Sequence, residues 1–236
     1  MVRPRITEQE YQLIKDFREI NQTRVLVIGD IHEPFCLDGY FEFCVEQYLK
    51  YQCNKVVFSG DIIDNHYSSY HETDADGLGG GDELELATIK LKRWYAAFPD
   101  ADILIGNHDR MIMRKAQTSS IPTKWIKEYK DVLEVPDWRF VDRLVIDNVQ
   151  YIHGEGGEAK VKAISDMMST VQGHYHTKAY VQWFVGQKFK IFAMQSACGI
   201  DHDSYAMAYA QRGKKPAIGC GVVIGGEIAI NLLMDL

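Results

Sequence analysis

Three short apolar runs in the first half of the chain each end at a glycine followed by a polar residue, and this pattern constrains the fold most. The runs read RVLVIGD at 24–30, KVVFSGD at 55–61 and ADILIGNHD at 101–109. Segments with apolar residues near helical spacing lie between them, at 37–51 and 83–98. Apolar strands that alternate with helices indicate a parallel sheet covered on both faces. The first half of the chain is therefore predicted to be α/β.

From about residue 138 onward the chain consists of alternating or apolar segments joined by short turns. Three turns stand between such segments, at Asp147-Asn148, Gly186-Gln187 and Gly225-Gly226. Short polar or glycine turns between apolar segments are typical of β-hairpins. The second half is therefore predicted to be mainly β, with one helix near 158–168.

Two more helices are predicted outside these regions. An apolar stripe indicates a helix at 6–20, and a helix is also expected at 110–130, interrupted at Pro122. No linker separates the two halves of the chain, so residues 1–236 are predicted to form a single domain.

The composition excludes several classes of protein. The chain has 236 residues, of which 46% are hydrophobic and 25% charged, which is enough to bury a sizeable core. The net charge of -7 provides no basic field that would attract nucleic acid, so stable nucleic-acid binding is not indicated. The N-terminus lacks the apolar core of a signal peptide, and no apolar run is long enough to span a membrane. A cytoplasmic protein is expected, and its oligomeric state stays open.

The cysteines support this expectation. The five cysteines are odd in number and form no C-x-x-C pair. They are expected to be reduced and mostly buried thiols.

Five predicted strand ends carry polar residues of the kinds that bind metal ions. They read GDIH at 29–32, GDIID at 60–64, GNHD at 106–109, HG at 153–154 and GHYH at 173–176. Loops at the carboxyl ends of parallel strands converge on one crevice. Seven side chains are expected to meet there: Asp30, His32, Asp61, Asn107, His153, His174 and His176.

The chemistry of these seven donors indicates divalent metal ions. Carboxylate, imidazole and amide groups, with no thiolate among them, suit hard or borderline cations. Seven donors exceed what one ion takes from a protein while leaving room for substrate. Two ions about 3.5–4 Å apart that share one carboxylate would use all seven. Two divalent metal ions are therefore the expected cofactors, with manganese first and iron, zinc, cobalt or nickel as alternatives.

The ordered turns GD-x-H, GD-x-x-D, GNH-D, a lone histidine and GH-x-H resemble the motifs of the calcineurin-like metallophosphoesterase superfamily. They span residues 29–176, about three-fifths of the chain. The resemblance implies a four-layer α/β/β/α sandwich, in which helices flank two mixed β-sheets. It also implies roles for nine residues: Asp30, His32 and His176 would hold one metal and Asn107, His153 and His174 the other, Asp61 would bridge them, and His108 would be a catalytic residue with Asp64 behind it.

The chemistry of phosphoester hydrolysis agrees with these roles. Two cations would neutralise the phosphoryl oxygens and lower the pKa of a bridging water, so that hydroxide attacks phosphorus in line. The leaving alkoxide needs a proton, and His108, beside Asn107, is placed to donate it. Asp64 would accept a hydrogen bond from that imidazole, fix its tautomer and raise its pKa. The predicted function is a metal-dependent phosphoesterase.

Departures from the motifs of particular families narrow the substrate. Serine/threonine protein phosphatases continue the second motif as Asp-Arg-Gly, where this chain has Asp64-Asn65-His66, and they carry Glu at the place of Asp109. Purple acid phosphatases have a tyrosine ligand at the place of Asp64. A small phosphodiester or nucleotide-type substrate is therefore predicted. A phosphomonoesterase or protein phosphatase is the alternative, and a non-catalytic binding scaffold on this fold is a further one.

Other residues near the motifs carry weaker predictions. Arg110 and Arg114 lie one helical turn apart and would either bind a substrate phosphate or form a solvated helix face. Asp109 is expected to cap the helix that follows it.

The loop at about 65–82 follows the second motif and contains three consecutive glycines. It is either a mobile lid over the metals, with His66 as a candidate substrate-binding residue, or a surface excursion. His202, which follows a later predicted strand, is expected at the surface.

Overall fold

The computed structural model describes residues 7–9, 22–69, 74, 76–205 and 214–235. The helix expected at 6–20 falls almost entirely outside these residues. Part of the expected loop at 65–82 also does.

The first sheet has six strands in the order β11-β10-β1-β2-β3-β4. Strands β1, β2 and β3 are parallel, as predicted for the first half of the chain. Strand β4 also pairs in parallel with β3, although it lies in the segment predicted to form hairpins, and the C-terminal hairpin adds to β1 in antiparallel fashion. The strands are β1 (Arg24–Ile28), β2 (Lys55–Phe58), β3 (Asp102–Leu104), β4 (Arg139–Val141), β10 (Gly219–Ile224) and β11 (Ile228–Leu233). The sheet is therefore mixed, because β10 pairs antiparallel to β1, and β11 forms the edge beyond it.

The second sheet has five strands in the order β5-β6-β7-β9-β8. The strands are β5 (Arg143–Ile146), β6 (Val149–Ile152), β7 (Ser169–Gln172), β8 (Tyr180–Val185) and β9 (Lys190–Gln195). The predicted hairpins β5–β6, β8–β9 and β10–β11 are confirmed. The hairpin pattern did not predict that β6, β7 and β9 pair in parallel. This parallel pairing brings the carboxyl ends of β6 and β7 to the same edge.

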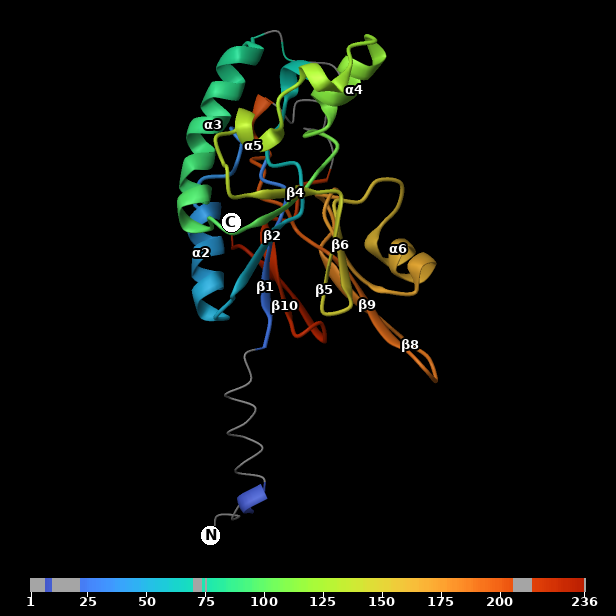
Figure 1. Ribbon diagram of the computed structural model, residues 1–236. Helices are drawn as coiled ribbons and strands as arrows, with labels where there is room; N and C mark the ends of the chain where they lie inside the picture. The colour runs from blue at the N-terminus through green and yellow to red at the C-terminus, as the bar shows by residue number, and fades with distance from the viewer. Residues whose placement is uncertain (1–6, 10–21, 70–73, 75, 206–213, 236) are drawn as a thin grey trace.

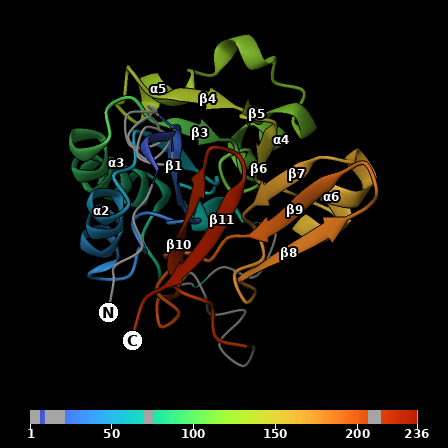
Figure 2. The ribbon, with the colours of Figure 1, turned by 90° about the horizontal axis from the view of Figure 1, so that it is seen from below.

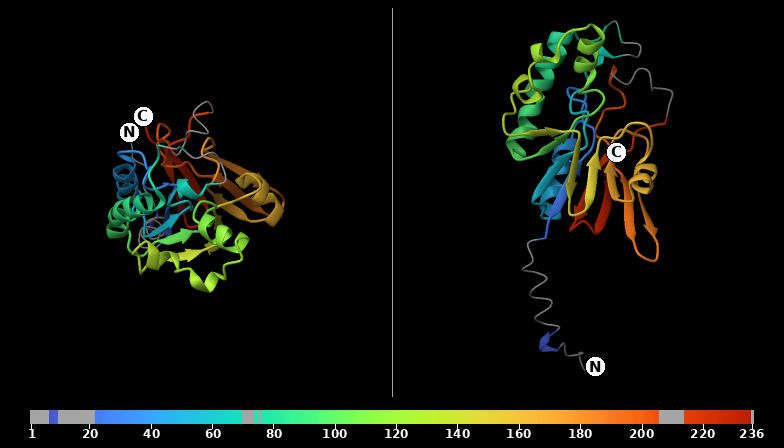
Figure 3. Two further views of the ribbon diagram at one scale, coloured as in Figure 1. Left: turned by 90° about the horizontal axis from the view of Figure 1, so that it is seen from above. Right: turned by 45° about the vertical axis from the view of Figure 1, so that its right-hand side comes forward.

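Helices cover the outer faces of both sheets (Figure 1). Helices α2 (Tyr40–Lys50) and α3 (Gly80–Ala97) lie on the first sheet, and α6 (Ala159–Asp166) lies on the second. The right-hand view of Figure 3 shows the resulting layers, so the four-layer α/β/β/α sandwich is confirmed. The helix expected at 110–130 is divided into α4 (Met111–Thr118), the 3-10 turns of η2 (Thr123–Trp125) and α5 (Tyr129–Val132). None of the described helices is long and apolar enough to cross a membrane.

Alternate side chains of β1 build the two main cores. Leu26 and Ile28 point towards the helices, where they pack in one cluster with Trp94 of α3. Val25 and Val27 point the other way and pack between the sheets in a cluster that includes Phe192. Figure 2 shows the two sheets facing each other. Burying an aliphatic side chain of this size contributes about 1.5–3 kcal/mol, so both clusters hold β1 in place. The five cysteines are free and buried, as predicted.

Candidate metal centre

The seven predicted donors lie just beyond the carboxyl ends of strands from both sheets. Asp30 and His32 follow β1, Asp61 follows β2 and Asn107 follows β3, while His153 follows β6 and the turn with His174 and His176 follows β7. Because strands within each set are parallel, these turns share one edge of the sandwich. The structure therefore brings together the side chains that the sequence motifs single out.

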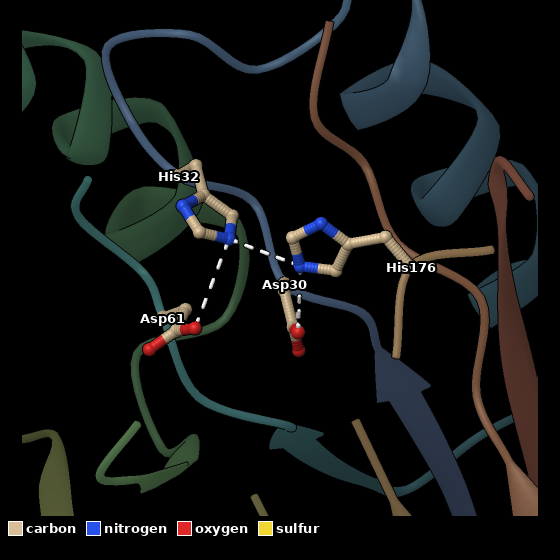
Figure 4. Close-up of side chains that lie close together, drawn as sticks. All are labelled: Asp30, His32, Asp61 and His176. Atoms are coloured by element: carbon tan, nitrogen blue, oxygen red, sulfur yellow. Dashed lines mark hydrogen bonds and ion pairs between the residues drawn. The ribbon is translucent and has the colours of Figure 1, made fainter. Parts of the chain in front are cut away.

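The first donor group contains Asp30, His32, Asp61 and His176, whose ligand atoms all lie within 4.8 Å of one another. The Nε2 atoms of His32 and His176 are 3.2 Å apart (Figure 4). His176 Nε2 lies 3.2 Å from Asp30 Oδ2, and His32 Nε2 lies 3.8 Å from Asp61 Oδ2. Two imidazole nitrogens and two carboxylate oxygens thus face one small volume.

The second donor group contains Asp61, His153 and His174, again within 4.8 Å. Asn107 joins it, because its Oδ1 atom lies 2.9 Å from Nε2 of His153. The same Nε2 lies 3.2 Å from Asp61 Oδ2. His153 donates through Nδ1 to the backbone oxygen of Ser59 at 2.9 Å, which leaves Nε2 to present a lone pair to a cation. Asp61 belongs to both donor groups.

A hydrogen bond to Asp64 orients His32. Nδ1 of His32 donates to Asp64 Oδ1 at 2.7 Å, and both side chains are buried. A carboxylate in this position fixes the imidazole tautomer and directs Nε2 towards a metal. The family resemblance instead implies that Asp64 supports His108. The carboxylate is 3.4 Å from Nδ1 of His108, whose nearer partner is the backbone oxygen of Asp64 at 2.6 Å.

Further hydrogen bonds orient the carboxylates of Asp30 and Asp61, the two acidic donors. The Ser59 hydroxyl donates to Asp30 Oδ1 at 2.6 Å, and the backbone N–H of His174 donates to Asp30 Oδ2 at 2.7 Å. The backbone N–H of His108 donates to Asp61 Oδ1 at 2.8 Å. Sequence reasoning missed Ser59, although its place just before Gly60-Asp61 at the end of a strand marks it.

The backbone of the turns is bent sharply at the donors. His32, Asp61 and His174 adopt left-handed conformations, with φ values of 47°, 45° and 72°. Such conformations are costly for non-glycine residues and concentrate at functional sites. The turns also approach one another closely, because a Cβ atom at Gly106 would overlap the Asp61 carboxylate and one at Gly173 would overlap that of Asp30. Glycine at these two positions lets the carboxylates reach the centre.

The charges of the centre influence one another strongly. Burial alone would raise the pKa of Asp61, but His153 and His108 hold it well below its ordinary value. Burial likewise opposes the ionised form of Asp30, yet the hydrogen bond from His176 and the charge of His153 lower its pKa. For His153 burial lowers the pKa, and the charge of Asp61 outweighs it and raises the pKa to about 10. Without a cation, the carboxylates therefore retain a proton on His153.

The donor chemistry fits divalent metal ions. Nδ1 of His32 and of His153 are used to donate, so their Nε2 lone pairs point at carboxylate and amide oxygens. Such a convergence of acceptors is unfavourable unless a proton or a cation lies among them. Imidazole with carboxylate and amide oxygen is a donor set for borderline and hard divalent cations. The clusters of Asp and His thus fit a divalent metal site.

His108 lies beside the first donor group and contributes no atom to it. Its ring packs edge-on against His32, with centroids 4.6 Å apart. Its Nδ1 donates to Asp64 O, its backbone N–H donates to Asp61, and its backbone oxygen accepts from Asn65. Burial lowers the pKa of His108, but the charges of Asp61 and Asp64 outweigh it, and the pKa is raised. Nε2 is the atom that these bonds leave for a substrate.

None of the three candidate substrate-binding residues belongs to a donor group. Arg110 forms ion pairs with Asp142 at 2.9 Å and with Glu155 at 2.6 Å. Arg114 is an exposed residue of α4. His66 is buried, and its Nε2 accepts a hydrogen bond from the backbone N–H of Asp74, so it holds the loop in which it lies.

Asp109 does not cap the helix that follows, and that prediction is wrong. Its buried carboxylate accepts hydrogen bonds from the backbone N–H groups of Gly106 at 2.8 Å and Ile62 at 3.2 Å. Helix α4 begins after Arg110 without a side-chain cap. Burial raises the pKa of Asp109 to about 7. Asp109 thus ties the second turn to the third, which a local motif could not indicate.

His202 lies in the segment after β9 and belongs to none of the donor groups. It is half-buried, whereas a surface position was expected.

A cavity of about 950 Å³ lies next to the second and third turns. Ile63, Asn65 and Asp109 line one part of it, and the rest is lined by apolar and charged residues, among them Ile112 of α4, Lys130 of α5 and Phe140 of β4. None of the seven donors lines this cavity, so it is distinct from the metal centre.

Comparison with known proteins places this geometry in context. A family model described as calcineurin-like phosphoesterase matches residues 23–191, which include all five turns. No match was found among curated protein sequences. Solved structures of similar fold include vacuolar protein sorting 29 from Cryptosporidium parvum, at 13% identity and a TM-score of 0.48, covering 91% of this chain and 92% of that one.

Two other Vps29 structures are similar. A single mutant from Entamoeba histolytica has 12% identity and a TM-score of 0.43 and covers 90% of this chain and 100% of that one. The Chaetomium thermophilum protein has 12% identity and a TM-score of 0.40, covering 90% and 95%.

Proposed function

Because this chain belongs to the calcineurin-like phosphoesterase family, we propose that it hydrolyses phosphoesters at a pair of divalent metal ions. The substrate proposed is a small phosphodiester or nucleotide-type compound. The observation that carries the proposal is the pair of donor groups that share Asp61. A carboxylate shared between two sets of donors is the arrangement that two-metal hydrolysis requires. Manganese is the first choice of metal, with iron, zinc, cobalt and nickel as alternatives.

Each residue then has a role. Asp30, His32 and His176 would hold one ion and Asn107, His153 and His174 the other, with Asp61 between them. When bound, the two ions supply charge neutralisation at the phosphoryl oxygens and an activated water at neutral pH. His108 donates a proton from Nε2 to the leaving oxygen. Although burial opposes it, the charges of Asp61 and Asp64 raise the pKa of His108, which favours the protonated imidazole.

The surroundings of the centre support a diester over a monoester. A phosphomonoester carries about 1.5–2 negative charges near pH 7 and a diester carries one, so a monoester needs more cationic partners. The position that holds a phosphate-gripping arginine in the protein phosphatases holds Asn65. Arg110, close in sequence to His108, is engaged by Asp142 and Glu155. Both observations favour the substrate with the smaller charge.

The test compares bis-p-nitrophenyl phosphate with p-nitrophenyl phosphate. Metal-stripped protein is assayed with and without added Mn²⁺, alongside Asp61→Asn and His108→Ala. Asp100→Asn, at an exposed position, and His202→Ala, at a half-buried position outside the donor groups, serve as matched controls. We expect Mn-dependent cleavage of the diester, loss of cleavage in Asp61→Asn and unchanged activity in the controls. His108→Ala should lose only about twofold or less on this substrate, because p-nitrophenolate leaves with little need for a proton.

Two outcomes would contradict this proposal. Cleavage of the monoester alone would make the protein a phosphomonoesterase. Cleavage of neither substrate by protein that holds two manganese ions would favour the non-catalytic scaffold.

A further inference from the structure

We propose that Asn65 is a positioning residue for His108. The inference rests on the proposed function, in which His108 protonates the leaving group. Asn65 is buried and follows Asp64 directly. Its Nδ2 atom donates a hydrogen bond to the backbone oxygen of His108 at 2.9 Å. The two residues are 43 positions apart in the chain, so this bond joins the second turn to the third.

The conformation of Asn65 explains why its amide reaches His108. Its backbone is left-handed, with φ of 53° and ψ of 39°. Asparagine is among the few residues that adopt this conformation at low cost. The Tyr67 hydroxyl donates to Oδ1 of Asn65 at 3.2 Å. Since Oδ1 accepts from Tyr67, Nδ2 faces the His108 carbonyl, and both ends of the amide have a partner.

The segment 64–65 and His108 exchange hydrogen bonds in both directions. The ring of His108 donates from Nδ1 to the backbone oxygen of Asp64 at 2.6 Å, and Asn65 donates to the backbone oxygen of His108. The ring is further confined by its edge-on contact with His32. The imidazole therefore cannot turn about its own side-chain bonds without breaking the bond to Asp64. Removing Asn65 frees the main chain that carries it, and small displacements of a catalytic group lower rates strongly.

The test removes the amide while keeping the backbone angle. Asn65→Gly retains access to left-handed φ, and Asn148→Gly is the matched control, because exposed Asn148 has φ of 59° in the β5–β6 turn. Tyr67→Phe removes the partner of the amide and leaves the backbone unaltered. The substrates are bis-p-nitrophenyl phosphate and diphenyl phosphate, which differ in how much their leaving groups need a proton.

We expect Asn65→Gly to lower kcat about tenfold on diphenyl phosphate and about twofold or less on the nitrophenyl diester. In Asn65→Gly, KM and the manganese content should stay unchanged. Tyr67→Phe should lower kcat less, again with the larger loss on diphenyl phosphate. Asn148→Gly should behave like the unaltered protein. His108→Ala gives the same pattern with a loss of about a hundredfold on diphenyl phosphate.

The outcomes separate this inference from the proposed function. Equal losses on both diesters in His108→Ala would overturn the proposed role of His108 and the inference with it. If the unaltered protein cleaves neither diester, the proposed function and the inference that rests on it are both overturned. Substrate-dependent losses in His108→Ala, but equal or no losses in Asn65→Gly and Tyr67→Phe, would overturn the inference alone. Loss of manganese or of folding in Asn65→Gly, with normal selectivity in Tyr67→Phe, would make Asn65 purely structural.

Discussion

Nδ1 of His32 lies 2.7 Å from Oδ1 of Asp64, and the same carboxylate lies 3.4 Å from Nδ1 of His108. The buried carboxylate of Asp64 thus contacts both His32, a candidate metal ligand, and His108, the proposed proton donor. The closer bond goes to His32, so the main effect of Asp64 is on the orientation of that imidazole. In the proposed reaction, Asp64 would therefore link metal binding to proton transfer.

Substitution Asp64→Ala is expected to weaken manganese binding about 10- to 100-fold, because His32 loses the partner that directs its Nε2. Calorimetric titration of metal-stripped protein with Mn²⁺ measures this. Asp100→Ala, at an exposed carboxylate, should bind manganese like the unaltered protein. Unchanged affinity in Asp64→Ala would show that the bond between His32 and Asp64 does not support the metal.

Metal binding is expected to release a proton from His153. Although burial opposes it, the charge of Asp61 raises the pKa of this imidazole to about 10 in the metal-free centre, so it is protonated at pH 7.5. A metal ligand must be neutral, and binding should therefore weaken by about tenfold for each pH unit lowered. Titrations in buffers of different ionisation enthalpy count the released protons. His202→Ala should release as many, and affinity that is constant between pH 6 and 8 would refute the prediction.

Glu83→Gln is expected to stabilise the protein at high pH. Burial raises the pKa of Glu83 to about 7, and its Oε2 atom has no hydrogen-bond partner among the described residues. The folded pKa is above the unfolded one, so folding binds a proton and stability falls as pH rises from about 4.5 to 7. Glutamine does not ionise, so the Glu83→Gln variant does not lose this stability as the pH rises. Its advantage over the unaltered protein should grow by about 1 kcal/mol between pH 5 and 8, after allowance for solvent screening.

Urea unfolding at pH 5 and pH 8 gives the free energies for this comparison. Glu85→Gln, at an exposed position of the same helix, is the control and should show no such change. An advantage that shrinks as pH rises would reverse the sign and contradict the raised pKa.

Gly106→Ala is expected to destabilise the protein by about 1–3 kcal/mol, because the added Cβ overlaps the Asp61 carboxylate and forces the turns apart. Manganese binding should be lost with it. Gly81→Ala meets open space in α3 and should be neutral or stabilising by up to about 1 kcal/mol. Thermal unfolding and metal content report both effects. A Gly106→Ala protein with normal stability and two bound metals would contradict this prediction, because it would show that the turns can shift to accommodate the added Cβ atom at little cost.

The sequence predicted much of the local structure correctly. The apolar runs before Gly29, Gly60 and Gly106 form parallel strands, and the turn at Asp147-Asn148 joins β5 to β6. These signals are local, because an apolar run with a glycine turn restricts its own backbone whatever the rest of the chain does. The seven donors were predicted in the same way, since each lies in a turn that follows a predicted strand.

The predictions that failed concern partners distant in the chain. Asp109 was expected to bond the helix next to it, but its carboxylate accepts from Ile62, 47 positions away. The hairpin pattern in the second half likewise did not indicate the parallel pairing of β6 with β7. In both cases two arrangements satisfy the same local pattern, and contacts with another segment select one.

The amino-acid sequence by itself determined which residue types stand at the strand ends, and hence that a centre of carboxylates and imidazoles would form at one edge of the sheets. Only the tertiary structure decided how those side chains are held: Asp64 on His32, Asn65 on His108, and Asp109 between the second and third turns. The physical reason is that buried polar groups must find hydrogen-bond partners, and packing of segments far apart in the chain selects which partners come within reach.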